Sequence, residues 1–243
     1  MAVADLSATT EKVRVWDLPT RIFHWTLVAA VFTAWATYEY SEALGDPTLT
    51  YHRYNGYLIL ILVTWRILWG IAGSETSRFA SFVRWPGAVL GYTARLFTGR
   101  DRHFLGHNPL GAYGVLALLS VLAVQGVLGL MSEEHNAVTW GPLYFLTEPE
   151  TRSEITDWHG TLFYYGLLVV VGLHVAGNAF HVVFKREPLV RAMVTGAKPA
   201  TDYADHGTAK PALRSPALAF ALLAVAAGLV FGTIKLLGGN LFY

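Results

Sequence analysis

The stretch from Trp158 to Phe184 constrains this chain more than any other, because it is apolar and long enough to cross a bilayer. It also carries three histidines, His159, His174 and His181, which a simple membrane anchor would not need. An ionisable side chain inside hydrocarbon is costly and by default marks a functional site. The sequence therefore predicts a membrane-spanning helix that contributes to such a site.

The spacing of two of these histidines indicates what kind of site to expect. At about 100° per residue, the interval from His159 to His174 leaves the two side chains roughly 60° apart around a regular helix, so they share a face. At about 1.5 Å of rise per residue, they lie roughly 22 Å apart along the axis. One helix would thus offer an imidazole near each side of the membrane. This arrangement suits two metal centres stacked across a bilayer, each with a second ligand from another helix.

The composition supports a membrane protein and excludes several other classes. The chain is 53% hydrophobic and 14% charged, and no polar interval is long enough to form a separate soluble domain. The formal net charge of +1 gives no indication of a nucleic-acid partner. Cysteine is absent, which excludes disulfides, cysteine-ligated zinc, iron–sulfur clusters and covalently attached haem. Any haem would have to be held non-covalently, with histidine as the obvious ligand.

The apolar runs predict an all-α integral membrane bundle with a four-helix haem-binding core and a fifth transmembrane helix. The expected spans are 22–38, 54–73, 109–131, 158–184 and 217–237. The first residues lack the apolar region of a signal peptide, so the first span is expected to stay in the protein. The remaining segments are a disordered tail at 1–13, a surface helix at 85–97, a linker at 197–213 and a final segment at 214–243 that holds the fifth helix. Gln125, inside the third span, is expected to form an interhelical hydrogen bond.

The distribution of Lys and Arg over the loops predicts the orientation. These residues gather near the N-terminus and in the loops 74–108 and 185–214, whereas 39–51 has none and 132–157 has only Arg152. Because basic loops stay on the cytoplasmic side, we expect a cytoplasmic N-terminus and a periplasmic C-terminus in a bacterial cytoplasmic membrane.

This topology sorts four histidines into two levels. His24 and His174 lie toward the inner side, and His52 and His159 toward the outer side. Two imidazoles on one iron fill both axial positions of a b-type haem, which then transfers electrons and leaves no position for a substrate. A histidine within a span can also be a hydrogen-bonded packing residue, and this alternative is least costly for the interfacial pair, His52 and His159.

Other polar residues near these levels have secondary roles in this hypothesis. His181 would lie at the hydrocarbon edge, where a contact to the haem propionates or the ligand surroundings is more suitable than ligation. Arg53 suits the propionates of the outer haem, and Arg21, Arg66 and Lys185 suit those of the inner one. Anchoring on the cytoplasmic side explains Arg21 and Lys185 equally well. The histidines outside the spans are expected to be solvated; they are His103, His107, His135 and His206.

Several motifs resemble those of the bacterial cytochrome b561 family, which includes the cytochrome b subunits of nickel–iron hydrogenases. They are RIFHW at 21–25, YHRYNGY at 51–57, WHG at 158–160 and GLHVAGNAFHVVFKREPLVRAMVTG at 172–196. WDLPTRIFHW and GHNPLGAYG are most similar to a branch with a fifth helix. The resemblance covers residues 14–196 and implies a membrane-embedded dihaem cytochrome b that exchanges electrons with quinone. It implies axial ligands at His24, His52, His159 and His174, and a non-ligating role for His181.

The favoured function is transmembrane electron transfer between the quinone pool and a periplasmic redox partner, either a soluble cytochrome c or a catalytic subunit. The quinone site is expected around Asp17, Arg21 and His181. The acidic loop 132–157 could dock a basic partner surface, although a solvated loop is an equally good interpretation. The sequence is compatible with both homo- and hetero-oligomers.

Two alternatives come from other functional classes. Some relatives oxidise superoxide at the outer face and reduce quinone, but this activity needs a cationic outer funnel and the outer face here is acidic. A non-redox transporter that binds a divalent metal through its histidines is the second alternative. The spans lack carboxylates beside the histidines, which such an ion path would need.

Overall fold

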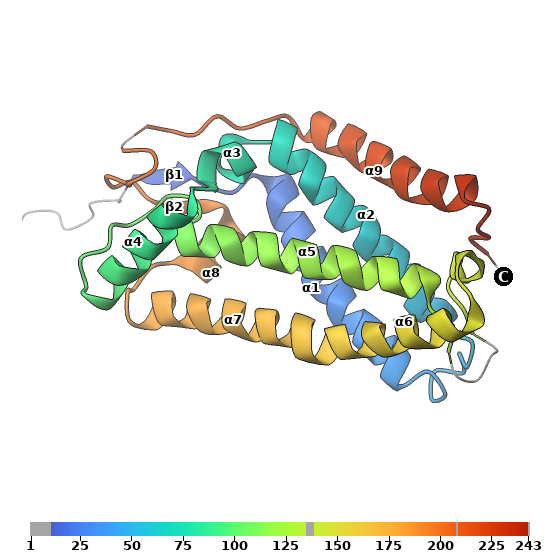
Figure 1. Ribbon diagram of the computed structural model, residues 1–243. Coiled ribbons are helices and arrows are strands. Elements are labelled where there is room, and N and C mark those ends of the chain that lie inside the picture. Colours follow the sequence, from blue (N-terminus) through green and yellow to red (C-terminus); the bar gives the residue numbers. More distant parts are fainter. Residues whose placement is uncertain (1–10, 135–138, 208, 243) are drawn as a thin grey trace, which may run out of the picture.

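The computed structural model describes residues 11–134, 139–207 and 209–242 and is dominated by long helices that run side by side (Figure 1). The long elements are α1 (Leu18–Glu39), α2 (Thr50–Ala72), α5 (Pro109–Met131), a continuous helix made of α6 (Pro149–Thr161), η3 (Leu162–Leu167) and α7 (Leu168–Val183), and α9 (Pro216–Leu236). The all-α bundle expected from the sequence is therefore confirmed.

Four of these helices are long and apolar enough to cross a membrane: α2, α5, the continuous helix Pro149–Val183 and α9. The first expected span forms α1, which is long enough at 22 residues but does not belong to that set. Polar side chains such as Arg21 and His24 lower the hydropathy of α1 relative to the others. A multi-pass membrane protein follows from the four apolar helices alone.

The helix of the fourth expected span, made of α6, η3 and α7, begins earlier than expected. It starts at Pro149, so residues 149–157, which were expected to belong to the outer loop, are its first turns. Pro149 in the first turn and Glu150 beside it are ordinary features of a helix N-terminus, and they outweigh the polarity of this segment. The helix widens into a π-helix at Leu162–Leu167, between His159 and His174. Such segments often occur at functional sites.

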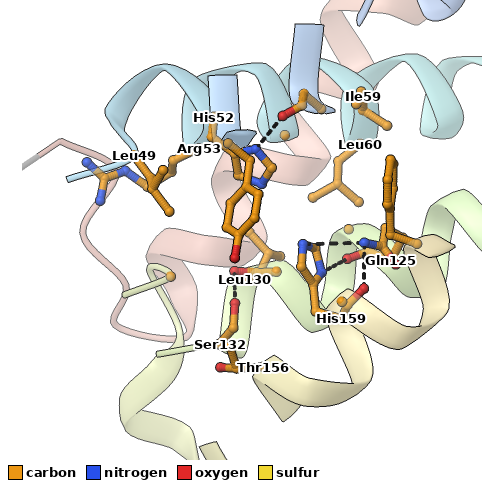
Figure 2. A pocket seen from close by; sticks show the side chains of 18 of the residues that line it. Leu49, His52, Arg53, Ile59, Leu60, Gln125, Leu130, Ser132, Thr156 and His159 are labelled. Atoms are coloured by element: carbon orange, nitrogen blue, oxygen red, sulfur yellow. Dashed lines mark hydrogen bonds between the residues drawn. The ribbon is translucent and has the colours of Figure 1, made fainter. Parts of the chain in front are cut away.

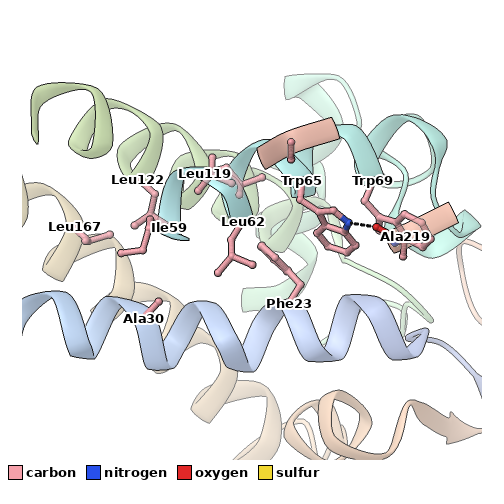
Figure 3. Packing of buried hydrophobic residues seen from close by; sticks show 12 residues of the cluster. Phe23, Ala30, Ile59, Leu62, Trp65, Trp69, Leu119, Leu122, Leu167 and Ala219 are labelled. Carbon is pink, nitrogen blue, oxygen red and sulfur yellow. Dashed lines mark hydrogen bonds between the residues drawn. The ribbon is translucent and has the colours of Figure 1, made fainter. Parts of the chain in front are cut away.

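Helix α2 lies at the centre of the bundle and contacts α1, α5 and α9. Half of an apolar 18-residue stretch of α2 is buried inside the protein, whereas only 11% to 17% of the corresponding stretch is buried in the other candidate spans. The main core cluster joins Phe23 and Ala30 of α1, Trp65 of α2, Leu119 of α5 and Ala219 of α9, among others (Figure 3). Trp65 stacks on Trp69 and donates its indole N–H to the backbone oxygen of Ala219 over 3.0 Å. Helices α7 and α9 are largely exposed and α5 is mostly half-buried, as lipid-facing helices at the edge of a bundle require.

Short elements close the end of the bundle where α4 lies (Figure 1). They are β1 (Lys12–Arg14), η1 (Glu75–Ser77), α3 (Phe79–Phe82), α4 (Pro86–Phe97), α8 (Leu189–Thr195) and β2 (Ala197–Pro199); η2 (Tyr144–Leu146) lies in the loop before α6. Strands β1 and β2 pair antiparallel, with Val13 opposite Lys198. The expected tail 1–13 and linker 197–213 therefore each contribute residues to a strand, and residues 1–10 lie outside the described part. Helix α4 forms where the sequence predicted a short helix at 85–97.

The start of α1 generates a test of stability. The Asp17 carboxylate accepts the backbone N–H of Thr20 over 2.6 Å and the indole N–H of the fully buried Trp69 over 3.3 Å. We expect Asp17→Ala to cost about 1 kcal/mol for the lost helix cap, because the Trp69 indole N–H keeps the Thr20 hydroxyl as a partner at 3.1 Å. Asp17→Asn keeps an acceptor oxygen and should retain most of the stability. Thermal inactivation in detergent would measure both variants, and equal losses in the two would contradict the capping role.

Candidate functional site

The structure brings four histidines together in two pairs, in the grouping that the sequence analysis expected. The ring centroids of His24 on α1 and His174 on α7 lie 6.5 Å apart. Those of His52 on α2 and His159 on α6 lie 6.2 Å apart. Two imidazoles that bind one metal ion from opposite sides, with metal–nitrogen bonds of about 2 Å, place their centroids roughly 6 Å apart. Both pairs therefore have the spacing of a bis-imidazole metal site.

We call His52 and His159 the outer pair and His24 and His174 the inner pair, after the levels expected from the sequence. The outer pair also has hydrogen bonds of the kind that prepare a histidine for ligation (Figure 2). The Nδ1 atom of His52 lies 2.8 Å from the backbone oxygen of Ala34, and the Nδ1 atom of His159 lies 3.0 Å from that of Gln125. A carbonyl oxygen can only accept, so each Nδ1 must carry the proton and donate it. Each Nε2 then keeps its lone pair. Metal-binding histidines fix their tautomer and orientation in this way.

A cavity of about 210 Å³ adjoins His52 and His159 and has a mainly apolar lining. It is walled by side chains from α1, α2, α5 and the fourth helix, which include Val31, Ile59, Leu60, Phe163 and Leu167. Glycines keep space open beside both histidines. A Cβ atom built on Gly56 or Gly160 would meet nothing within 4 Å, whereas one on Gly129 would lie 3.0 Å from the His159 ring. An apolar space beside two facing imidazoles fits a flat porphyrin.

Gln125 contacts the outer pair directly, which the sequence analysis did not anticipate. Its side-chain amide donates to the backbone oxygen of His159 over 3.0 Å and lies 3.3 Å from Nε2 of the same residue. The expected interhelical hydrogen bond is therefore present, and its partner is a candidate ligand. The only signal in the sequence was a lone amide in an otherwise apolar span.

The inner pair lies between α1 and α7. Nδ1 of His24 is buried and has no hydrogen-bond partner among the described residues. Such an orphaned ring nitrogen is costly in an apolar environment, and a metal bound through Nδ1 itself would account for it. Asn178 lies one turn after His174, donates to its backbone oxygen over 2.8 Å and approaches its Nε2 to 3.4 Å. Asn178 thus contacts one candidate ligand of the inner pair, as Gln125 contacts one candidate ligand of the outer pair.

The four cations expected near haem propionates have different environments. Arg66 is only 4% exposed, its guanidinium lies 5.1 Å from the Phe79 ring, and its Nη1 has no hydrogen-bond partner among the described residues. A buried cation with an unused donor is suited to an anionic group. Arg53 lines the outer cavity, and its Nη1 approaches the backbone oxygen of Trp140 to 3.5 Å. The environments of both arginines would suit an anionic propionate.

Arg21 and Lys185 have structural partners instead. Arg21 donates through Nη1 to the backbone oxygen of Val194 over 2.6 Å, which ties α1 to α8. Lys185 forms an ion pair with the buried carboxylate of Asp101. Arg21 also keeps a buried Nε without a hydrogen-bond partner among the described residues, so the choice between a propionate contact and anchoring stays open.

The three residues expected around a quinone have separate sets of partners. Asp17 caps α1 and is 5% exposed. His181 is 7% exposed and lies 3.5 Å from both Glu187 Oε1 and Asn108 Nδ2. The backbone N–H of Arg21 donates to the backbone oxygen of Asp17 over 3.2 Å, but within the described residues no side-chain hydrogen bond or ion pair joins any two of Asp17, Arg21 and His181. A quinone site formed by them stays a prediction.

The expectation that the histidines outside the spans are solvated was wrong for two of them. His107 packs between Trp16 and Phe82, with ring centroids 4.9 and 4.5 Å away. Burial lowers its pKa to about 3, so it is neutral. The His206 side chain is 12% exposed and lies 3.9 Å from Glu75. Residues distant in the sequence cover both, which local polarity could not reveal. His103 is 59% exposed and pairs with Glu187, and His135 lies outside the described residues.

The described residues contain no group of three or more His, Cys, Asp or Glu side chains that could hold a bare metal ion. Each histidine pair offers two imidazoles, with centroids 6.5 or 6.2 Å apart, which is a number and spacing that a porphyrin-bound iron would accept. The residues present therefore fit haem better than a bare divalent cation.

Comparisons with known proteins identify the family. The family model described as prokaryotic cytochrome b561 matches residues 15–196. The chain is 22% identical over 227 residues to a probable Ni/Fe-hydrogenase B-type cytochrome subunit of Rhizobium leguminosarum bv. viciae, across 80% of this chain and 92% of that protein. No solved structure matches. The chain belongs to the prokaryotic cytochrome b561 family and is a multi-pass membrane cytochrome b that transfers electrons.

Proposed function

We propose that this cytochrome carries electrons across the membrane through two b-type haems, one between His24 and His174 and one between His52 and His159. The observation that carries the proposal is the spacing of 6.5 and 6.2 Å between the facing rings, at two levels of one bundle. The haem iron supplies one-electron chemistry, and bis-imidazole ligation leaves it no open position. The function of the bundle is then to hold two redox centres in line.

The protein's own residues account for the positioning of these groups. Backbone oxygens of Ala34 and Gln125 fix the tautomers of the outer imidazoles, so that each Nε2 carries a lone pair. The amide of Gln125, which lies 3.3 Å from Nε2 of His159, would have to turn aside for that nitrogen to bind iron. Arg53 at the outer level and the buried Arg66 of α2 would neutralise propionates. The apolar walls exclude water, which keeps a buried redox centre in a low dielectric.

Two features support a complete crossing by α1 and the expected orientation. Helix α1 lies along α2 and contributes Phe23 and Ala30 to the main core, so it shares the depth of a helix that is itself apolar enough to span. The basic loops 74–108 and 185–214 flank one end of the bundle, which favours a cytoplasmic N-terminus and a periplasmic C-terminus.

The partner on the outer side would be basic. Glu150, Glu154 and Asp157 are exposed and recur at helical spacing on α6, so they form an acidic stripe that ends next to His159. Such a stripe would steer a cationic redox protein toward the outer haem, as either a soluble cytochrome c or a catalytic subunit. Because the similar protein from Rhizobium leguminosarum is a probable hydrogenase subunit, a redox-enzyme subunit is a reasonable candidate. The same stripe would repel superoxide and disfavours the superoxide-oxidising alternative.

Quinone would exchange electrons at the inner level, with Asp17, Arg21 and His181 as the candidate residues. A quinol that gives up two electrons also releases two protons. His181 leads through Glu187 to the exposed His103, at 3.5 and 2.9 Å, so a titratable route to water is available there.

Reduction by quinol tests the proposed function directly. The purified wild-type protein should show reduced b-type haem bands after addition of a quinol. His174→Ala should lose about half of the haem, because one axial ligand of one centre is missing, and should no longer be reduced by quinol. His103→Ala, which alters an exposed histidine, serves as a control and should keep the full haem content. If no quinol reduces the wild-type haem, the proposed function is wrong.

A glycine substitution can separate the two centres. A side chain at Gly129 would enter the space occupied by the His159 ring, whereas a Cβ atom at Gly114 on the same helix would meet nothing within 4 Å. We expect Gly129→Val to remove the outer haem and leave the inner one, and Gly114→Val to keep both. Haem per polypeptide and a redox titration, which should show one transition in place of two, would measure this. Retention of both centres in Gly129→Val would contradict the assigned outer site.

A further inference from the structure

Helix α4 presents an apolar stripe to the outside of the protein. Leu90 and Phe97 are 74% and 85% exposed, and Ala94 lies between them on the same face. The opposite face is docked, since Tyr92 is only 2% exposed and meets Phe104 edge-on at 5.7 Å. A short helix with this pattern beside the ends of membrane spans belongs at the membrane interface, with the stripe toward the acyl chains.

The end of α4 is shaped so that two arginines come together. Gly99 has a φ of +67°, and the backbone N–H of Arg100 donates to the oxygen of Arg95 over 2.9 Å. The N–H of Gly99 donates to the oxygen of Leu96 over 3.3 Å, which completes a Schellman turn. This turn folds Arg100 back beside the last turn of the helix. The position of Arg100 relative to Arg95 is thus set by the backbone.

These two arginines and Arg102 line one shallow pocket together with Tyr92 and Phe104. Positive charge dominates there. Arg102 meets Asp202 at 3.4 Å, where both side chains are mostly exposed, and the carboxylate of Asp101 is already engaged by Lys185. Within the described part of the chain, neither Arg95 nor Arg100 forms an ion pair. A cluster of three guanidinium groups with a single paired carboxylate, Asp202, suits an anion with several oxygens.

We propose that this pocket binds the phosphate headgroup of an anionic phospholipid, whose acyl chains lie along Leu90 and Phe97. The arginine cluster and the exposed apolar stripe belong to the same short helix, so one amphipathic ligand satisfies both. Inorganic phosphate would engage the arginines and leave the stripe unused. Basic clusters on interfacial helices attract anionic lipids, at about 1 kcal/mol per Lys or Arg near the surface. The site is independent of the histidine pairs and therefore of the proposed electron transfer.

Lipid retention tests this site. The full chain would be placed in nanodiscs made of equal amounts of phosphatidylglycerol and phosphatidylcholine. After the protein is released from the nanodiscs, the lipids that stay bound to it would be counted by native mass spectrometry. The test variant is R95Q/R100Q/R102Q. The matched control, R186Q/R191Q/R214Q, removes the same charge from exposed arginines of the other basic loop. Visible spectra and melting curves would establish that both variants are folded.

We expect the wild type and the control to retain phosphatidylglycerol in preference to phosphatidylcholine. The test variant should bind it more weakly by a factor on the order of a hundred. Equal retention in the test variant, or an equal loss in the control, would overturn the assignment. A further arm adds excess inorganic phosphate. The lipid should stay bound, and its displacement would identify free phosphate as the ligand and overturn the lipid proposal.

Discussion

Polar groups within hydrocarbon must find partners inside the protein, and this constraint orders the bundle. His52 and Asn55 of α2 reach backbone oxygens of α1, over 2.8 and 2.7 Å. Gln125 and His159 join α5 to α6, and Trp65 joins α2 to α9. The buried groups left without a partner among the described residues include Nδ1 of His24 and Nη1 of Arg66. In our account, these groups belong to a haem site and are the exceptions that function requires.

The charges at the two ends of the molecule differ in a way that suits two kinds of partner. Figure 1 places α4 at one end of the bundle and the start of α6 at the other. The first end carries the arginine pocket of α4, and the second carries the acidic stripe of Glu150, Glu154 and Asp157. Lipid phosphates would be attracted to the first end and a basic redox protein to the second. Both inferences agree with the orientation expected from the loops.

Much of this arrangement could be predicted from the sequence, because hydrophobic length and the cost of intramembrane histidines are local properties. These properties were enough to predict the all-α class and the surface helix at 85–97. They were also enough to pair His24 with His174 and His52 with His159. The start of the fourth helix at Pro149 was missed because polar residues were taken as a loop. The π-helix at Leu162–Leu167 and the burial of His107 between Trp16 and Phe82 depend on contacts between distant segments, which periodicity does not contain.

The central claim is that two pairs of imidazoles each hold one iron porphyrin, and haem stoichiometry combined with ligation state tests it most directly. The purified chain should contain two non-covalent b-type haems per polypeptide. Both should be six-coordinate and low-spin, and neither should bind carbon monoxide in the reduced state, because both axial positions are filled. A chain that is folded in the membrane but holds a single haem, or one whose reduced haem binds carbon monoxide, would contradict the account.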